Sequence, residues 1–289
     1  MPQKTAKVPS LRESDIAVAR ERPGPKEVPG EQVRVLARGL SILRAFTPRN
    51  EWLSNQEIAA RTSLPRPTVS RLTTNLTSLG YLSHSTPGGK YRLGSSVLTL
   101  GFSALARVDI RVLARPLLQR LADLEDALTV LASRDDMAMV CNEVCHSTKS
   151  LFTLRVNVGS RLVLPYSAMG LALLGAMTSE EREQALREIR ERFRKNWPEL
   201  QKLIENAVRQ YRQHGFCTTL ETLESGINGI SVAVDTPGAP HSFTIGMAGP
   251  SFRFPAERLV SDLGPKLLRI RRDLEARLAQ LTPDTGGST

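Results

Sequence analysis

Apolar residues recur at helical spacing in the first third of the chain. One face of a predicted helix over residues 66–79 carries apolar side chains three or four positions apart: Val69, Leu72, Leu76 and Leu79. A shorter helix is expected before it, because Ser54 is a favourable N-cap residue and Glu57 completes a capping box. The shorter helix is expected to end near Thr62, and Ser63-Leu64 forms a short turn after it. Two helices joined by such a turn predict a helix-turn-helix motif.

The segments on either side of this motif complete a small domain. A strand at Tyr81-Leu82, a turn at Pro87-Gly88-Gly89 and a strand over 90–93 predict a two-stranded wing. A first helix is expected to end before Pro48, with an apolar face formed by Val35, Leu36, Leu40, Leu43 and Phe46. Residues 31–93 are therefore predicted to form one winged helix-turn-helix domain.

The pattern changes at Gly94. A linker helix is expected over 94–109, and leucines at helical spacing between 113 and 124 predict a long amphipathic helix. Further strands are expected over 128–133, 137–144, 151–156, 229–234 and 242–247, and further helices over 167–177, 179–193, 196–214 and 255–281. Strands and helices grouped in this way predict an α+β domain with an antiparallel sheet over residues 110–281.

A length of 289 residues suits two domains. Residues 1–30 contain five prolines and little apolar periodicity, so they are expected to form a disordered tail, as are residues 282–289. No apolar run approaches a transmembrane span, and the N-terminus lacks the apolar core of a signal peptide. We therefore expect a cytoplasmic protein without a membrane partner.

The net charge of +10 is concentrated on the predicted helix-turn-helix region. Residues 31–95 hold nine Lys or Arg and three Asp or Glu, which gives +6. A solvated basic face is the ordinary explanation of such an excess. Here the positive charge coincides with a DNA-binding motif, and this coincidence favours attraction to the phosphates of duplex DNA.

Basic and hydroxyl side chains on the predicted motif are the candidates for DNA contact, because they reach phosphates and base edges. On the second helix these candidates are Arg66, Thr68, Ser70, Arg71 and Thr74, with Arg66 and Arg71 as the main readers. In the wing they are Lys90 and Arg92, which are expected to bind phosphates. Elsewhere in the domain they are Arg34, Arg38, Ser54 and Asn55.

No catalytic residue, metal ligand set or cofactor site is expected. The three cysteines, Cys141, Cys145 and Cys217, form no CxxC pair. Cys145-His146 would suit a metal or a nucleophile, but its apolar neighbours favour a strand and structural thiols. The four histidines lack ligand spacing, and no GxSxG, HExxH or phosphate-binding glycine loop is present.

Several segments, in this order and spacing, resemble the isocitrate lyase regulator (IclR) family of bacterial transcription factors over about residues 33–281. In the first half they are ARGLSILRAF at 37–46, SNQEIAARTSLPRPTVSRLTTNL at 54–76, GYL at 80–82 and KYRLGSSVLTLG at 90–101. In the second half they are VGSRLVLPYSAMGLALLGAM at 158–177, ESGINGISVAV at 224–234 and FTIGMAGP at 243–250. The resemblance implies a GAF-like effector domain after the linker helix, and dimers that often pair into tetramers.

A ligand site is suggested at the start of the helix over 168–177. Ser167 is a candidate N-cap, and the N–H groups of Ala168, Met169 and Gly170 would form an anion site if the helix end faces a cavity. An ordinary capped core helix is the alternative. The family places its effector near this helix start, which favours a site walled by Leu154, Leu162, Met169, Gly229, Gly246 and Ala248.

This chain departs from the family pattern at the expected pocket wall. Polar residues are common in the family where Gly229, Gly246 and Ala248 stand, and a lysine is common where Leu171 stands. Loss of these polar groups favours an apolar or aromatic carboxylic acid over a two-carbon acid. Glu221 or Glu224 is a further candidate that would accept a hydroxyl proton from the effector, although a solvated loop glutamate fits equally.

Three functions follow as hypotheses. The first is a transcriptional regulator of a catabolic operon, whose operator affinity changes when a small organic acid binds. The second is a DNA-bridging structural protein whose C-terminal domain only oligomerises. The third is an enzyme with a catalytic C-terminal domain. Ligand-dependent operator affinity separates the first hypothesis from the second, and turnover of the ligand is required by the third.

Overall fold

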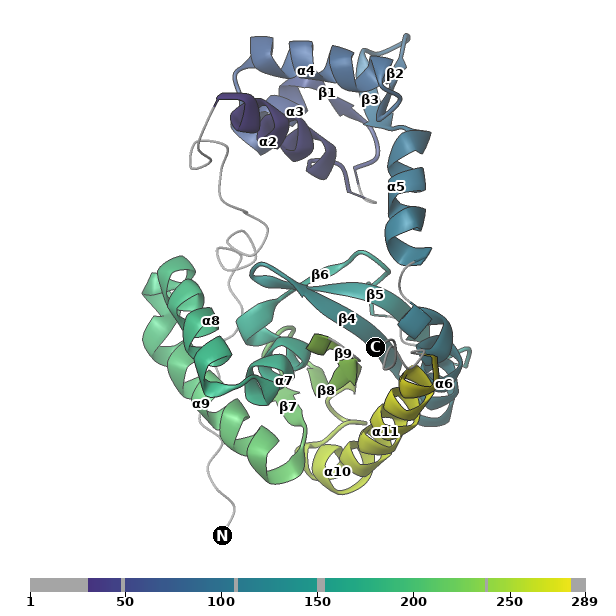
Figure 1. Cartoon of the computed structure of the whole chain (residues 1–289), viewed down its shortest axis with the longest axis vertical. Coiled ribbons are helices and arrows are strands. Elements are labelled where there is room, and N and C mark those ends of the chain that lie inside the picture. The colour runs from purple at the N-terminus through teal and green to yellow at the C-terminus, as the bar shows by residue number, and fades with distance from the viewer. Residues whose placement is uncertain (1–30, 48–49, 107–108, 150–153, 237–238, 282–289) are drawn as a thin grey trace, which may run out of the picture. The chain divides into compact units, whose positions relative to one another are not determined.

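The computed structural model describes residues 31–47, 50–106, 109–149, 154–236 and 239–281 (Figure 1). These residues form two compact units, one ending before Asp109 and one from Asp109 onward. None of the helices in these ranges is both long and apolar enough to cross a membrane. The expected tails at 1–30 and 282–289 lie outside the described residues.

The N-terminal unit is a winged helix-turn-helix. Its elements are α2 (Glu31–Arg44), β1 (Leu53–Ser54), α3 (Asn55–Thr62), α4 (Arg66–Ser78), β2 (Leu82–Ser85), β3 (Lys90–Leu93) and α5 (Ser95–Ala106). The strands form an antiparallel sheet in the order β1-β3-β2. Ile58 of α3, Val69 of α4 and Leu82 of β2 are almost fully buried in one core.

Two details of the predicted apolar faces are wrong. On α2, the side chains of Val35, Leu36 and Leu40 are exposed, and Ile42, which was not predicted, is fully buried, whereas the predicted Leu43 and Phe46 do pack in the core. The reason is that α2 packs against α3 and α4 along its C-terminal half. On α4, the helix ends at Ser78, so Leu79 leaves the buried face and is exposed.

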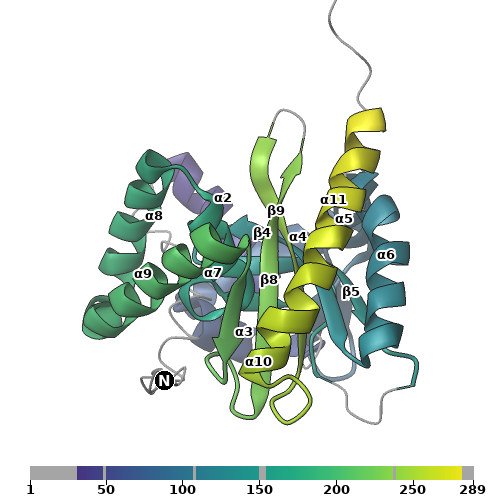
Figure 2. The same cartoon turned by 90° about the horizontal axis from the view of Figure 1, so that it is seen from below.

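The C-terminal unit is built on a six-stranded sheet, and Figure 2 labels its strands β4, β5, β8 and β9. The elements up to its middle are α6 (Asp109–Glu125), β4 (Leu128–Asp135), β5 (Ala138–His146), β6 (Arg161–Val163), a short 3-10 turn (Leu164–Tyr166), α7 (Ala168–Ala176) and α8 (Ser179–Arg192). The remaining elements are a 3-10 turn (Arg194–Asn196), α9 (Trp197–His214), β7 (Cys217–Leu220), β8 (Ile227–Thr236), β9 (Ala239–Pro250), α10 (Ala256–Arg258), a π-helical turn (Leu259–Leu263) and α11 (Gly264–Leu281).

All neighbouring strands of this sheet are antiparallel, in the order β6-β5-β4-β9-β8-β7. Helices α6 and α11 pack on one face, and α7 packs on the other with α9 behind it (Figure 2). The α+β class with an antiparallel sheet is thus confirmed.

Some predicted elements differ from the structure. Residues 154–156 form no strand, and the rest of the strand expected over 151–156 lies outside the described residues. Strands β6 and β7 were not predicted; they are three and four residues long and are defined by their pairing with β5 and β8. The closing helix expected over 255–281 is interrupted by the π-helical turn at Leu259–Leu263.

A bulge at Asn142 in strand β5 reverses the alternation of side chains, so that odd-numbered residues face one side of the sheet before it and the other side after it. Leu131 pairs with Glu143 and Ala132 with Cys141, so Asn142 has no opposite residue. Before the bulge, Cys141 faces the apolar cluster that contains α7. After it, the buried carboxylate of Glu143 lies beneath α6 and pairs with Arg111 and Arg115. The bulge therefore places a charged residue under α6 and leaves the α7 side apolar.

Candidate functional site

Helix α3 begins with the predicted capping box. The Ser54 hydroxyl accepts a hydrogen bond from the N–H of Glu57, and the Glu57 carboxylate accepts one from the Ser54 N–H at 2.8 Å. These bonds from Ser54 are the main reason that the pKa of Glu57 lies below its usual range. Ser63 follows α3 in a left-handed conformation, and this residue makes the tight turn toward α4. The side chain of Ser54 is thus engaged in fixing the helix-turn-helix.

The exposed face of α4 gathers four of the five candidate residues of this helix. Arg66, Ser70 and Thr74 follow one another at four-residue intervals, and Arg71 lies beside them. All four are exposed, whereas Thr68 is only partly so. Within the described ranges neither Arg66 nor Arg71 forms an ion pair. The two guanidinium groups are therefore available to an anionic partner.

Some of the hydroxyl and amide candidates already have structural contacts. The Asn55 side chain accepts a hydrogen bond at 3.1 Å from Thr73, which is fully buried in α4. This bond ties α3 to α4. The Thr74 hydroxyl donates to the carbonyl of Ser70 at 2.9 Å, along the helix. Thr74 must turn this hydroxyl away from the helix before it can donate to a base.

The two arginine candidates on α2 differ in their surroundings. Arg34 is exposed near the start of the helix, whereas Arg38 is half-buried one turn later. The Nε atom of Arg38 is buried without a hydrogen-bond partner in the described structure. A donor of this kind is satisfied when an acceptor reaches it.

The wing presents Lys90 and Arg92 on the same face of β3. Both side chains are exposed, and Tyr91 between them points into the core. Trp52, which was not among the predicted site residues, lies with its ring 5.0 Å beneath the Arg92 guanidinium. A tryptophan in a polar stretch of sequence is unusual and could have drawn attention to this position. Its pairing with Arg92 could not be predicted, because β1 is only two residues long.

The start of α7 is capped as expected. The Ser167 side chain accepts a hydrogen bond from the N–H of Gly170 at 3.1 Å, and Ser167 is almost fully buried. The expectation that the Gly170 N–H is free is therefore wrong, because the cap uses it. The first-turn N–H groups of Ala168 and Met169 have no acceptor within their own helix. They remain the candidate anion donors.

Two glycines of the sheet face this helix start. A Cβ atom added to Gly229 of β8 would lie 3.5 Å from the Cβ of Ala168 and 3.1 Å from the hydroxyl of Thr219. A Cβ added to Gly246 of β9 would lie 3.1 Å from the terminal methyl group of Met169. The structure thus brings the beginning of α7 together with both glycines, and the Met169 side chain occupies the space over Gly246.

The remaining wall candidates belong to the same apolar cluster. Leu154 and Met169 are buried in it, and Leu162 and Ala248 pack against it partly exposed. Three buried hydroxyls lie beside the two glycines, on Thr219, Ser231 and Thr244. The Ser231 hydroxyl donates to the carbonyl of Ile245, whereas that of Thr244 has no hydrogen-bond partner among the described atoms. The surroundings of the α7 start are thus apolar except for these three hydroxyls.

Glu221 lies in the turn between β7 and β8 and closes that turn. It has a positive φ of 53°. Its N–H donates to the side chain of Asn228 at 2.9 Å, and its carboxylate accepts from the N–H of Gly226 at 3.1 Å. Both Glu221 and Glu224 are exposed. The contacts that Glu221 makes here are those of a loop residue.

The three cysteines are free and buried, as the interpretation of structural thiols requires. Burial raises the pKa of Cys141 to about 12, and it also raises the pKa values of Cys145 and Cys217. A thiol with a raised pKa is a poor nucleophile at neutral pH.

Comparison with known proteins places both units in context. Residues 35–85 match the model of the IclR helix-turn-helix domain, and residues 102–276 match that of the bacterial transcriptional regulator IclR C-terminal domain. The HTH-type transcriptional regulator TsaQ1/TsaQ2 of Comamonas testosteroni is 33% identical over 87% of this chain and 90% of its own length.

Solved structures agree with these matches. An IclR family transcriptional regulator from Brucella abortus is 38% identical, with a TM-score of 0.77 over 90% of this chain and 97% of that one. An IclR homologue from Microbacterium hydrocarbonoxydans, in complex with 4-hydroxybenzoate, is 22% identical, with a TM-score of 0.66 over 85% and 99% of the two chains. The second likeness is one of fold.

Proposed function

Because this chain belongs to the IclR family of bacterial transcriptional regulators, we propose that it controls a catabolic operon in response to a small, aromatic or apolar organic acid. Residues 31–93 would bind the operator, residues 94–109 would link the domains, and residues 110–281 would bind the effector. A protein of this kind works because its effector prefers one of two conformations that differ in DNA affinity.

The DNA contact is assigned to α4 and the wing. Arg66 and Arg71 extend from the exposed face of α4 without ion-pair partners in the described structure. A helix with such a face suits the major groove, where arginine donates two hydrogen bonds to guanine. Lys90 and Arg92 would bind phosphates beside it. Ser54 and Asn55 would support this surface mainly by fixing α3 and α4.

The main support for the proposed effector site is the arrangement of groups at the start of α7. Two N–H groups, of Ala168 and Met169, begin this helix among apolar side chains and opposite Gly229 and Gly246. A carboxylate bound there would accept these hydrogen bonds and gain from the positive end of the helix dipole. An apolar body would then lie against Leu154, Leu162 and Ala248.

Met169 sets the space available to that body. Its side chain lies over Gly246, so an effector with an aromatic ring would displace it. Methionine adopts many rotamers at low cost, and it packs favourably against aromatic rings. The Microbacterium homologue has 4-hydroxybenzoate bound, which agrees with this class of ligand. The apolar surroundings of α7 in this chain are the primary support.

A titration tests the assignment. The operator is first obtained by selecting genomic fragments that the full-length chain retains. Benzoate, 4-hydroxybenzoate, acetate and benzamide are then added to the complex, and DNA affinity is measured by fluorescence anisotropy. The proposal expects aromatic acids to change the affinity several-fold, while acetate and the uncharged benzamide have little effect. A response to acetate alone, or equal responses to benzoate and benzamide, would contradict the proposed site.

Two further points complete the proposal. We propose a homodimer, pairing into a tetramer, because one winged domain contacts too few base pairs for genomic specificity. Sedimentation of the operator complex tests this, and a monomer with full affinity would refute it. The effector is also expected to be recovered unchanged after long incubation, whereas its conversion to a product would support the enzyme hypothesis.

A further inference from the structure

Trp52 and Arg92 form a stacked pair on the surface of the wing. The guanidinium carbon of Arg92 lies 5.0 Å from the centroid of the Trp52 ring. Trp52 directly precedes β1, in which Leu53 pairs with Tyr91 of β3. One residue further along the same antiparallel register, Trp52 comes opposite Arg92. The stack is thus fixed by the pairing of two strands.

Both members of this pair remain open to solvent. Trp52 is 37% exposed, and Arg92 is also exposed. Leu53 and Tyr91, the residues next to them, are buried in the core of the unit. An indole that served only the core would turn inward with these neighbours. Trp52 instead lies on the outer side, where its visible contact is with a cation.

The surrounding face of the wing sheet is basic and polar. Lys90 shares this face with Arg92 because side chains two positions apart point the same way. On the other side of β3, Ser83 pairs with Arg92 and Ser85 with Lys90. The Ser85 hydroxyl donates to the carbonyl of Pro87 at 3.2 Å. The strands therefore offer two cations and the hydroxyl of Ser83. These are groups that bind phosphate oxygens.

We propose that Trp52 is a positioning residue for Arg92, and that the two form one contact unit for a DNA phosphate. This inference rests on the proposed DNA-binding function and adds Trp52 to the interface. The negative face of the indole attracts the guanidinium and holds its long side chain in one direction. The N–H groups in the guanidinium plane remain able to donate to a phosphate. Arg92 is thereby ordered before the DNA arrives, and less side-chain freedom is lost on binding.

Binding to a mixed-sequence duplex tests the pair, because a phosphate contact does not depend on base sequence. The full-length variants are Trp52→Ala, Trp52→Phe, Arg92→Ala and the double variant Trp52→Ala/Arg92→Ala. Anisotropy is measured between about 50 and 200 mM NaCl. Phe252→Ala is the matched control, since Phe252 is a large apolar residue of the other unit that is 82% exposed.

We expect Trp52→Ala to weaken binding about two- to fivefold, the effect of losing a solvent-exposed cation–π contact. Trp52→Phe should retain most of the affinity, because it keeps an aromatic face. Arg92→Ala should lower the salt slope by about one phosphate contact. The double variant should bind no more weakly than Arg92→Ala, because Trp52 acts through Arg92. The control should bind like the unaltered chain.

A spectroscopic measurement covers the case in which Trp52→Ala fails to fold. The chain has two tryptophans, so Trp197→Phe leaves Trp52 as the single indole reporter. DNA should change its fluorescence in that background, and Arg92→Ala should abolish the change. An unchanged signal on DNA binding would overturn the inference, as would additive losses in the double variant or full affinity in Trp52→Ala. If the unaltered chain binds no duplex at all, the DNA-binding proposal itself fails.

Discussion

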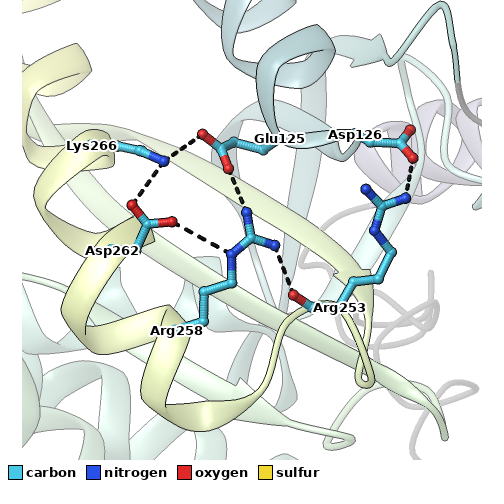
Figure 3. A network of polar contacts seen from close by, with 6 residues as sticks. All are labelled: Glu125, Asp126, Arg253, Arg258, Asp262 and Lys266. Atoms are coloured by element: carbon cyan, nitrogen blue, oxygen red, sulfur yellow. Dashed lines mark hydrogen bonds and ion pairs between the residues drawn. The ribbon is translucent and has the colours of Figure 1, made fainter.

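Glu125 and Arg258 meet at 2.6 Å although 133 positions separate them in the chain. Figure 3 shows that Lys266 reaches the other oxygen of the same carboxylate and that Asp262 bridges the two cations. Glu125 ends α6, while its two partners lie on α10 and α11, and Asp262 lies on the π-helical turn between them. The cluster therefore fixes the end of the first helix of this unit to its last helical segment.

Removing the charge of Glu125 should destabilise the C-terminal unit. The Glu125 side chain is only 3% exposed, and Glu125→Gln leaves Arg258 and Lys266 with Asp262 as their remaining anion. We expect a loss of about 1–2 kcal/mol in the free energy of unfolding, because both cations are partly exposed and keep their contacts with Asp262. Urea titration measures it, with Glu191→Gln on the exposed surface of α8 as the control. Equal stability of both variants would show that the cluster contributes nothing net.

The same cluster predicts a dependence on alkaline pH. Hydrogen bonds to Asp262 and then to Glu125 raise the pKa of Lys266 above its usual 10.5. A cation with a raised pKa adds stability in full below its unfolded pKa, and this stability is lost as the pH rises through the folded pKa. The unfolding free energies of the unaltered chain and of Lys266→Gln should therefore differ constantly from neutral pH to about 10 and converge above it. A difference that grows above that pH would contradict the assignment.

The packing at the start of α7 requires a glycine at position 170. A Cβ there would lie 2.0 Å from the carbonyl oxygen of Leu164, which is backbone and cannot simply rotate away. Gly170→Ala is expected to lower the free energy of unfolding by more than about 2 kcal/mol. Gly39→Ala in α2 is the matched control, because no atom lies within 4 Å of its added Cβ. That change should instead stabilise the helix by up to about 1 kcal/mol.

Arg71 is expected to contribute to sequence recognition. If it donates two hydrogen bonds to a guanine, Arg71→Ala should weaken operator binding by about 1–3 kcal/mol and relax the preference at that position. Binding is compared on the selected operator and on single-base variants of it. Arg277→Ala, an exposed arginine of α11, serves as the control. Unchanged operator affinity of Arg71→Ala would remove this residue from the recognition surface.

Gly229 provides a test of the effector site by size. Gly229→Leu should fill the space beside Ala168 and Thr219 and abolish the response to the acid, while operator binding without effector is retained. Gly229→Ala is the matched smaller change, since its Cβ meets Ala168 at an ordinary contact distance and requires only a small shift of the Thr219 hydroxyl, 3.1 Å away. It should reduce the response only partly. An unaltered affinity of Gly229→Leu for the effector would place the site elsewhere.

The sequence was most informative where local rules act alone. The capping box of Ser54 and Glu57 and the apolar spacing of Val69 and Leu72 are set by residues three or four positions apart. The Ser167 cap is predictable for the same reason. Features that depend on distant partners were not predictable. Examples are the short strand β7, which exists because it pairs with β8, and the exposure of Leu36, which follows from how α2 meets α4.

The candidate sites show the same division. A pattern of basic residues suggested α4 and the wing, yet it could not show that Trp52 comes opposite Arg92. The position of Gly170 in the first turn of its helix likewise suggested a free N–H, but this N–H donates to the Ser167 side chain. Residue type indicates which groups are able to bind a ligand. Which of them are already bound to the protein itself is decided by tertiary contacts.

The extra residue at Asn142 decides which side of the sheet each later side chain of β5 faces. Deleting it would restore uniform alternation and turn Glu143 and Cys145 toward the apolar cluster, away from Arg111 and Arg115. If a relative has a one-residue gap at this position of an alignment, the charged residue of its strand is therefore expected on the opposite face of the sheet. Chimeras that exchange strands with a relative must cross over on the same side of Asn142 in both parents.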